Sequence, residues 1–360
     1  MSERVEEHLR SLFAAAERRG CCLVPTTKAE IAALRRRKEK NLVVSPVRGL
    51  YARADYWNSL GPIQQAAHTI RALARLHPTW VFCSSSAAVL LSLEPSAIQA
   101  ESIHVLASSV ESRRAPEWLV RHELKNCPVM RCNGILVTDP LRTAYDCIRA
   151  TNFPRALAIA NALMRREHLG RQQLTQELAS RYRKHPGIAR VLATCRLATG
   201  LCENGGESVF VGIAMSKGFA RPFEQVEILR PNNEPGCLYR ADFAWMAPDG
   251  RVIIGELDGR EKYSLPDVRG VRDPIEALLR ERRRESELTR TSDAIVRFSY
   301  AERRGATSSF SGFCRSACRG VRCRSTATAS PSATIHGVNT RRRETRCPRT
   351  SSSRSWERSA

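Results

Sequence analysis

The chain has 360 residues, of which 42% are hydrophobic and 26% charged. It can therefore fold, and its length exceeds what one hydrophobic core usually serves, so we expect an α+β multidomain protein. The 58 Lys and Arg residues exceed the 36 Asp and Glu residues by +22, an excess that favours polyanions such as nucleic acid. The apolar stretches are too short to span a bilayer and no secretory segment is visible, so the sequence predicts a cytoplasmic protein with no membrane contact.

The opening 58 residues, the first predicted domain, show a helix, a basic helix and a short hairpin. Apolar residues recur at helical spacing over 5–16, and Gly20 is placed to end that helix. Thr27 followed by Glu30 is a capping box and predicts the start of the second helix. Two short β-branched runs over 41–52 then predict a hairpin. This order of elements is typical of a winged helix.

Basic side chains on the second helix and the hairpin predict contact with double-stranded DNA. A helix with clustered arginines can enter the major groove while a basic wing lies along the phosphates. A solvated helix face explains the same charges, so the order of elements is what favours DNA. The candidate DNA-contacting residues are Arg35, Arg36, Arg37, Lys38 and, on the hairpin, Arg48.

Residues 59–200 form the second predicted domain, which is mostly helical with some strands. Asp139 followed by Pro140 predicts a helix start. On that helix Arg142 and Asp146 stand four residues apart, so we expect a structural ion pair. The other predicted elements are helices at 64–76, 87–93, 153–169 and 174–182 and a strand at 102–107.

Residues 201–300 form the third predicted domain, in which three carboxylates fall on neighbouring elements. Glu207 opens a helix, and the two strands of a following hairpin carry Asp242 and Glu256 near one end. Hydrolysis of a phosphodiester by a bound cation needs hard oxygen ligands. Asp242 and Glu256 are therefore candidate ligands for Mg²⁺, with Glu207 in reach of the same point. The alternative is an edge hairpin whose carboxylates are only solvated.

This helix-Glu, strand-Asp, strand-Glu order resembles the PD-(D/E)xK, or restriction-endonuclease-like, fold. The motifs RADF at 240–243 and ELDG at 256–259 look like its very-short-patch-repair (Vsr-like) branch. The pattern usually has Lys where this chain has Asp258, and Lys262 stands near the place of a His found in that branch. The resemblance implies the catalytic candidates Glu207, Asp242, Glu256, Asp258 and Lys262. A helix expected at 274–288 adds Arg283 as a further DNA contact.

Three more motifs resemble proteins related to AbiEi antitoxins of abortive-infection, or type IV toxin–antitoxin, systems. They are RGLY at 48–51, SSSAA at 84–88 and TDPLRTAYD at 138–146. The resemblance implies a winged-helix DNA reader followed by an antitoxin-like helical domain, here fused to a Vsr-like nuclease-like domain. It also implies a cognate toxin as a partner.

The last sixty residues, 301–360, differ in composition from the rest. They hold thirteen Arg, three Glu and no Leu, so they cannot bury enough apolar surface to fold and are expected to be disordered. An appended basic arm and a shifted reading frame after Tyr300 both explain this tail, and we favour the second.

Three functions are compatible with these patterns. The first is a DNA-binding regulator or antitoxin-like protein that carries a nuclease-like domain, in toxin–antitoxin or phage-defence biology. The second is an active Mg²⁺-dependent DNA endonuclease. The third is a non-enzymatic interaction scaffold whose charge only keeps it soluble. We expect the first.

Overall fold

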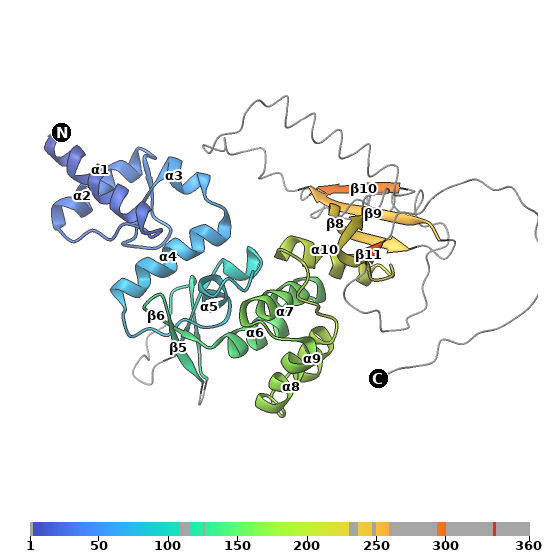
Figure 1. The fold of residues 1–360 in the computed structure, drawn as a ribbon. Coiled ribbons are helices and arrows are strands. Elements are labelled where there is room, and N and C mark those ends of the chain that lie inside the picture. Colours follow the sequence, from blue (N-terminus) through green and yellow to red (C-terminus); the bar gives the residue numbers. More distant parts are fainter. Residues whose placement is uncertain are drawn as a thin grey trace, which may run out of the picture.

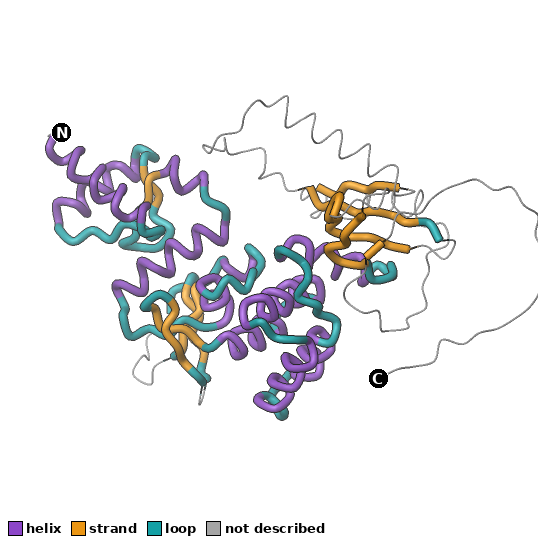
Figure 2. The backbone as a smooth tube through the Cα atoms, viewed as in Figure 1, coloured by secondary structure: helices purple, strands orange, loops and turns teal. Residues whose placement is uncertain are grey.

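A computed structural model describes residues 3–107, 115–124, 127–229, 237–246, 250–258, 294–299 and 334–335. Over these residues the chain is an α+β protein, with helices filling most of the first two thirds and a sheet at the C-terminal side (Figure 2). Lys262, Arg283, the helix expected at 274–288 and nearly all of the tail lie outside the described residues. None of the described helices is long and apolar enough to cross a membrane.

The N-terminal elements match the expected order. The capping box is present: Glu30 N–H donates to Thr27 Oγ1 at 3.1 Å, and the Glu30 carboxylate accepts from Thr27 N–H at 3.3 Å. Gly20 follows the first helix with φ +58°, a conformation that glycine adopts without strain. The elements are α1 (Glu3–Arg18), α2 (Lys28–Glu39), the hairpin β1 (Val43–Val44) and β2 (Ala52–Arg53), and α3 (Ala54–Ser59).

Helix α4 (Pro62–Leu76) is attached to this N-terminal unit by polar contacts. Arg71 Nη1 donates to Gly20 O at 2.9 Å, and Cys22 N–H donates to His68 O at 3.2 Å. The Tyr56 hydroxyl lies 2.9 Å from His68 Nε2. Helices α3 and α4 and the end of α1 are therefore held together.

The middle of the chain is helical with two small strand pairs. Strands β3 and β4 are parallel, β5 and β6 are antiparallel, and Phe82 forms single bridges to Val105 and Val137. The helix expected from Ala87 begins earlier, at Ser84. The bounds are α5 (Ser84–Leu90), the short 3₁₀ turn Ile98–Ala100, β3 (Ile103–Leu106), β4 (Leu119–His122), β5 (Val129–Cys132), β6 (Ile135–Thr138), α6 (Pro140–Arg149), α7 (Phe153–Glu167), α8 (Arg171–Arg181) and α9 (Ile188–Cys195).

The C-terminal part is helix α10 against a five-stranded sheet with the order β10-β9-β8-β7-β11. Strands β7, β8 and β9 are antiparallel, whereas β10 runs parallel to β9 and β11 parallel to β7. The bounds are α10 (Gly205–Ser216), β7 (Phe223–Leu229), β8 (Cys237–Met246), β9 (Val252–Asp258), β10 (Ala294–Ser299) and β11 (Thr334–Ile335). The short β11 belongs to the tail that we expected to be disordered throughout.

Helix α10 lies between α7 and the sheet (Figure 1). On the sheet side the Phe210 ring stacks on Phe243, with centroids 4.7 Å apart. On the α7 side, a Cβ built on Gly212 would fall 2.5 Å from Pro154 Cα, and Asn161 Nδ2 donates to Ser208 Oγ at 3.0 Å. Buried contacts therefore cross the boundary that we placed between residues 200 and 201.

Candidate functional site

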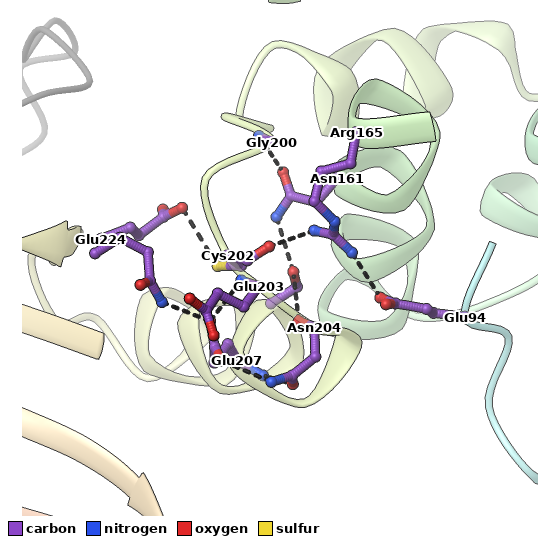
Figure 3. Close-up of polar contacts among 11 residues, drawn as sticks. Glu94, Asn161, Arg165, Gly200, Cys202, Glu203, Asn204, Glu207 and Glu224 are labelled. Atoms are coloured by element: carbon purple, nitrogen blue, oxygen red, sulfur yellow. Dashed lines mark hydrogen bonds and ion pairs between the residues drawn. The ribbon is translucent and has the colours of Figure 1, made fainter. Parts of the chain in front are cut away.

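Glu207 is a buried carboxylate at the N-terminus of α10, with 4% of its surface exposed. Its Oε2 accepts from Glu203 N–H at 2.7 Å and from Gln225 Nε2 at 2.9 Å, and its Oε1 accepts from Asn204 Nδ2 at 2.6 Å (Figure 3). Three N–H donors thus hold the side chain in one orientation. Such a donor set offsets the cost of burying a carboxylate.

The segment before α10 is tied to α7, which fixes where Glu207 lies. Asn204 caps the helix, with its Oδ1 accepting from Glu207 N–H at 3.0 Å. Asn161 Oδ1 accepts from the backbone N–H groups of Thr199 and Gly200 at 2.9 and 3.0 Å. Arg165 donates to the Cys202 carbonyl, as Figure 3 shows. The carboxylate is therefore positioned by side chains of α7 as well as by its own helix.

The other two predicted acids lie near the same end of the neighbouring strands β8 and β9. Phe243 and Gly255 are the last pair of β8 and β9 toward this end, and Asp242 and Glu256 are the next residues on the two strands. Glu224 and Val226 pair with the neighbours of Asp242, which puts Gln225 on its other side. From β7 the Gln225 side chain donates to Glu207. Both acids are half-buried.

The charges of this cluster influence one another. Burial first, and then the Asp242 charge, raises the pKa of Glu207 to about 7, while the Gln225 hydrogen bond opposes the shift. Asp242 Oδ2 accepts the Leu257 backbone N–H at 2.9 Å, which orients the Asp242 carboxylate toward the end of β9.

The carboxylate pair has the donor chemistry that Mg²⁺ prefers. Mg²⁺ is commonly bound through one or two carboxylates while it keeps several waters. Asp242 and Glu256 supply oxygens of this kind, and the Glu207 oxygens accept three N–H groups. Within the described residues no group of three or more His, Cys, Asp or Glu is arranged to hold a metal ion. Asp258 is the last residue of β9, and the Lys262 expected near this site is not among the described residues.

The basic residues predicted on α2 do not share one face. Arg35, Arg36 and Lys38 are exposed, but Arg37 is only 7% exposed. Arg37 lies 2.6 Å from Glu6 in an ion pair and donates to Ala33 O at 3.0 Å. The expectation that Arg37 contacts DNA is therefore corrected: this arginine is three residues after Leu34 and turns to the same buried side.

The N-terminal unit carries exposed bases and several acids. Three of these acids, Glu6, Glu17 and Glu30, pair with Arg37, Arg53 and His8, respectively. Glu7 and Glu39 are exposed and form no salt bridge with a described residue. In the described parts of the chain, Arg35, Arg36, Lys38 and Arg48 form no salt bridge. Arg48 is exposed in the loop between β1 and β2, beside Gly49, whose φ is +88°.

Two further features were not predicted, one on β7 at the site and one on β3 and β4 in the middle of the chain. Gln225 has φ +52° within a strand, a conformation unusual for a residue with a side chain. His104 Nδ1 and His122 Nε2 lie 2.8 Å apart on neighbouring strands. Neither feature can be recognised from residue spacing in the sequence, because both depend on which strands pair.

Comparisons with known proteins give distant similarities. No protein-family model matches the chain. Two proteins of Mycobacterium tuberculosis strains, uncharacterized protein MT2308 and uncharacterized protein Rv2248, are each 29% identical to it over 186 residues. The match covers 52% of this chain and 65% of each relative, so the chain spans just under two thirds of their length. The crystal structure of RV2827C protein from Mycobacterium tuberculosis is similar at 12% identity over 61% of this chain and 77% of that chain, with a TM-score of 0.27.

Proposed function

We propose that the protein is a DNA-binding regulator whose N-terminal unit is a winged helix, with α2 in the major groove and the β1–β2 hairpin along the phosphates. This proposal depends on one observation. Four basic residues on these two elements are exposed and form no salt bridge with a described residue: Arg35, Arg36, Lys38 and Arg48. The capping box fixes the start of α2, and the buried Arg37 ties α2 to α1, so the exposed side chains project from a rigid helix. Phosphate contacts by such bases supply most non-specific affinity for DNA.

The antitoxin-like role is proposed from the three sequence motifs and from the element order around them. The TDPLRTAYD motif forms a capped helix start in which Asp139 accepts from Arg142 N–H at 2.6 Å. The Arg142–Asp146 pair within it is buried. Under this proposal a cognate toxin is the protein partner, and duplex DNA is the nucleic-acid partner.

Arg36→Ala is expected to weaken duplex binding without unfolding the chain, because Arg36 is exposed on α2 and makes no salt bridge with a described residue. Losing one phosphate contact should lower the slope of log K against log salt by about 0.9. Binding isotherms at several salt concentrations measure this slope. Lys217→Ala is the matched control, because Lys217 is an exposed base at the end of α10. Equal slopes for the two variants would remove α2 from the DNA interface.

A second candidate function is Mg²⁺-dependent hydrolysis of a DNA phosphodiester by a restriction-endonuclease-like unit made of α10 and the sheet. It is favoured by the position of Asp242 and Glu256 near the same end of two neighbouring strands, with the Asp242 charge close enough to raise the pKa of Glu207. In this proposal Asp242 and Glu256 hold the cation, and Gln225 holds Glu207 in place beside them. A bound Mg²⁺ would neutralise phosphate charge and lower the pKa of an attacking water.

If this second function holds, supercoiled plasmid is nicked in the presence of Mg²⁺ or Mn²⁺, and both Asp242→Asn and Glu256→Gln abolish the nicking. The substitutions keep size while removing the charge that holds the cation. Gel electrophoresis of the plasmid reads the result, and Lys217→Ala should cleave normally. If the wild-type protein binds duplex DNA but cleaves neither duplex nor single-stranded DNA, the nuclease proposal is wrong and only the regulator proposal remains. If the wild-type protein shows no salt-dependent binding to duplex DNA, the interaction-scaffold function is favoured.

A further inference from the structure

The turn between α8 and α9 carries a second concentration of positive charge, remote in sequence from α2. Residues 183–187, with the sequence RKHPG, are all exposed. From 178 to 202 the chain contains five Arg and Lys residues and no Asp or Glu. The exposed bases at the turn itself are Arg183 and Lys184, and His185 follows them directly.

Aromatic packing holds this turn in one conformation. The Tyr145 hydroxyl donates to Pro186 O at 2.5 Å, and the Tyr145 and Tyr182 rings stack with centroids 4.4 Å apart. The His185 ring meets Tyr182 edge-on at 5.3 Å. Gly187 has φ +84°, which suits glycine at the entry to α9. The bases are thus displayed on a preformed surface, so little conformational entropy of the backbone is lost when a ligand binds.

The acids near the turn are already engaged. Asp146 Oδ2 lies 2.7 Å from Arg142 Nε, and Asp146 Oδ1 lies 3.4 Å from Arg149 Nε. Asp139 and Glu177 both pair with Arg181, at 3.2 and 3.5 Å. Among the described residues, no carboxylate pairs with Arg183 or Lys184. Their charge therefore faces solvent without local compensation.

We propose that the α8–α9 turn is a second polyanion-binding surface, which contacts the phosphate backbone of duplex DNA independently of base sequence. The proposal rests on the DNA-binding function proposed above and extends it to the middle of the chain. A turn of this size presents point charges and no helix or ribbon, the elements that read base edges in the major groove. Segment 183–187 has no large aliphatic or aromatic side chain of the kind that inserts into a lipid surface.

The test uses the full-length chain with Arg183→Ala and Lys184→Ala combined, and a mixed-sequence duplex. Losing two phosphate contacts should lower the salt slope by about 1.8, so the affinity lost between about 50 and 200 mM salt should shrink about twelve-fold. The matched control combines Arg196→Ala and Lys217→Ala, which removes the same charge from two other exposed positions. The swap Arg183→Lys with Lys184→Arg keeps both charges and should bind as the wild type does. Circular dichroism checks that each variant is folded.

The outcomes separate this proposal from the proposed winged helix. If the turn variant loses slope while Arg36→Ala matches its control, the turn binds DNA and the winged-helix assignment is wrong. If Arg36→Ala loses slope while the turn variant equals the Arg196 and Lys217 control, the turn proposal is overturned. The turn proposal is also overturned if the turn variant loses binding to anionic phospholipid vesicles while its duplex binding is unchanged. A wild-type chain that binds no duplex DNA would overturn both the turn proposal and the winged-helix proposal.

Discussion

Asp146→Ala is expected to destabilise the protein by about 3–5 kcal/mol, the cost of removing one partner of a buried ion pair. The Asp146 carboxylate lies 2.7 Å from Arg142 Nε, and the two side chains are 8% and 9% exposed. Without Asp146 the Arg142 guanidinium stays buried over the Tyr145 and Tyr182 rings, each 5.8 Å away, with its charge uncompensated. Urea unfolding followed by circular dichroism measures the free energy of unfolding.

Replacing both partners tests whether the cost comes from the stranded charge. The pair Arg142→Met and Asp146→Leu should recover most of the lost stability, because well-packed apolar replacements of a buried pair are often neutral. Glu177→Ala removes a carboxylate from an exposed pair with Arg181 and should change stability by about 0.5 kcal/mol or less. An Asp146→Ala cost as small as that of Glu177→Ala would contradict the buried pair.

Gly212→Val is expected to cost about 3 kcal/mol, the upper part of the range for overpacking. A Cβ at this position would meet Pro154 Cα at 2.5 Å and Pro154 Cβ at 3.0 Å. A backbone atom cannot rotate aside, so α7 and α10 would have to separate along their shared face. The melting temperature and the urea midpoint both report the change.

Gly170→Val is the matched control for this substitution. Gly170 precedes α8, and a Cβ built there meets nothing within 4 Å. Its cost should be about 1 kcal/mol or less, which reflects the weaker helix cap alone. Equal costs at the two glycines would show that the close approach of α7 and α10 does not limit stability.

Helix starts were predictable from the sequence because their signals are local. Thr27 with Glu30, and Asp139 with Pro140, place a cap within a few residues of the helix that it begins, and both caps are present. Strands β4, β5 and β6 were missed. Strand β4 pairs in parallel with β3, a pairing that no tight turn specifies. Strands β5 and β6 form a hairpin across Asn133 and Gly134, a local turn signal that our prediction overlooked.

The candidate site was predictable only in part for the same reason. The turn sequence at 248–250 made it foreseeable that Asp242 and Glu256 lie near one end of two neighbouring strands. Gln225 reaches the site through the pairing of β7 with β8, which no local sequence signal specifies. Arg37 was misassigned because a run of bases was treated as one surface. Its spacing from Ala33 and Leu34 predicts the buried side.

The position of α10 has a consequence for the integrity of the whole chain. Its Phe210 side faces the sheet, while Gly212 and Ser208 face α7. Cleavage by a protease at the connecting segment 199–204 should therefore yield two pieces that remain associated in gel filtration, as in a nicked but intact protein. The helical half and the sheet should melt in a single transition, since neither keeps a closed interior once the other is gone.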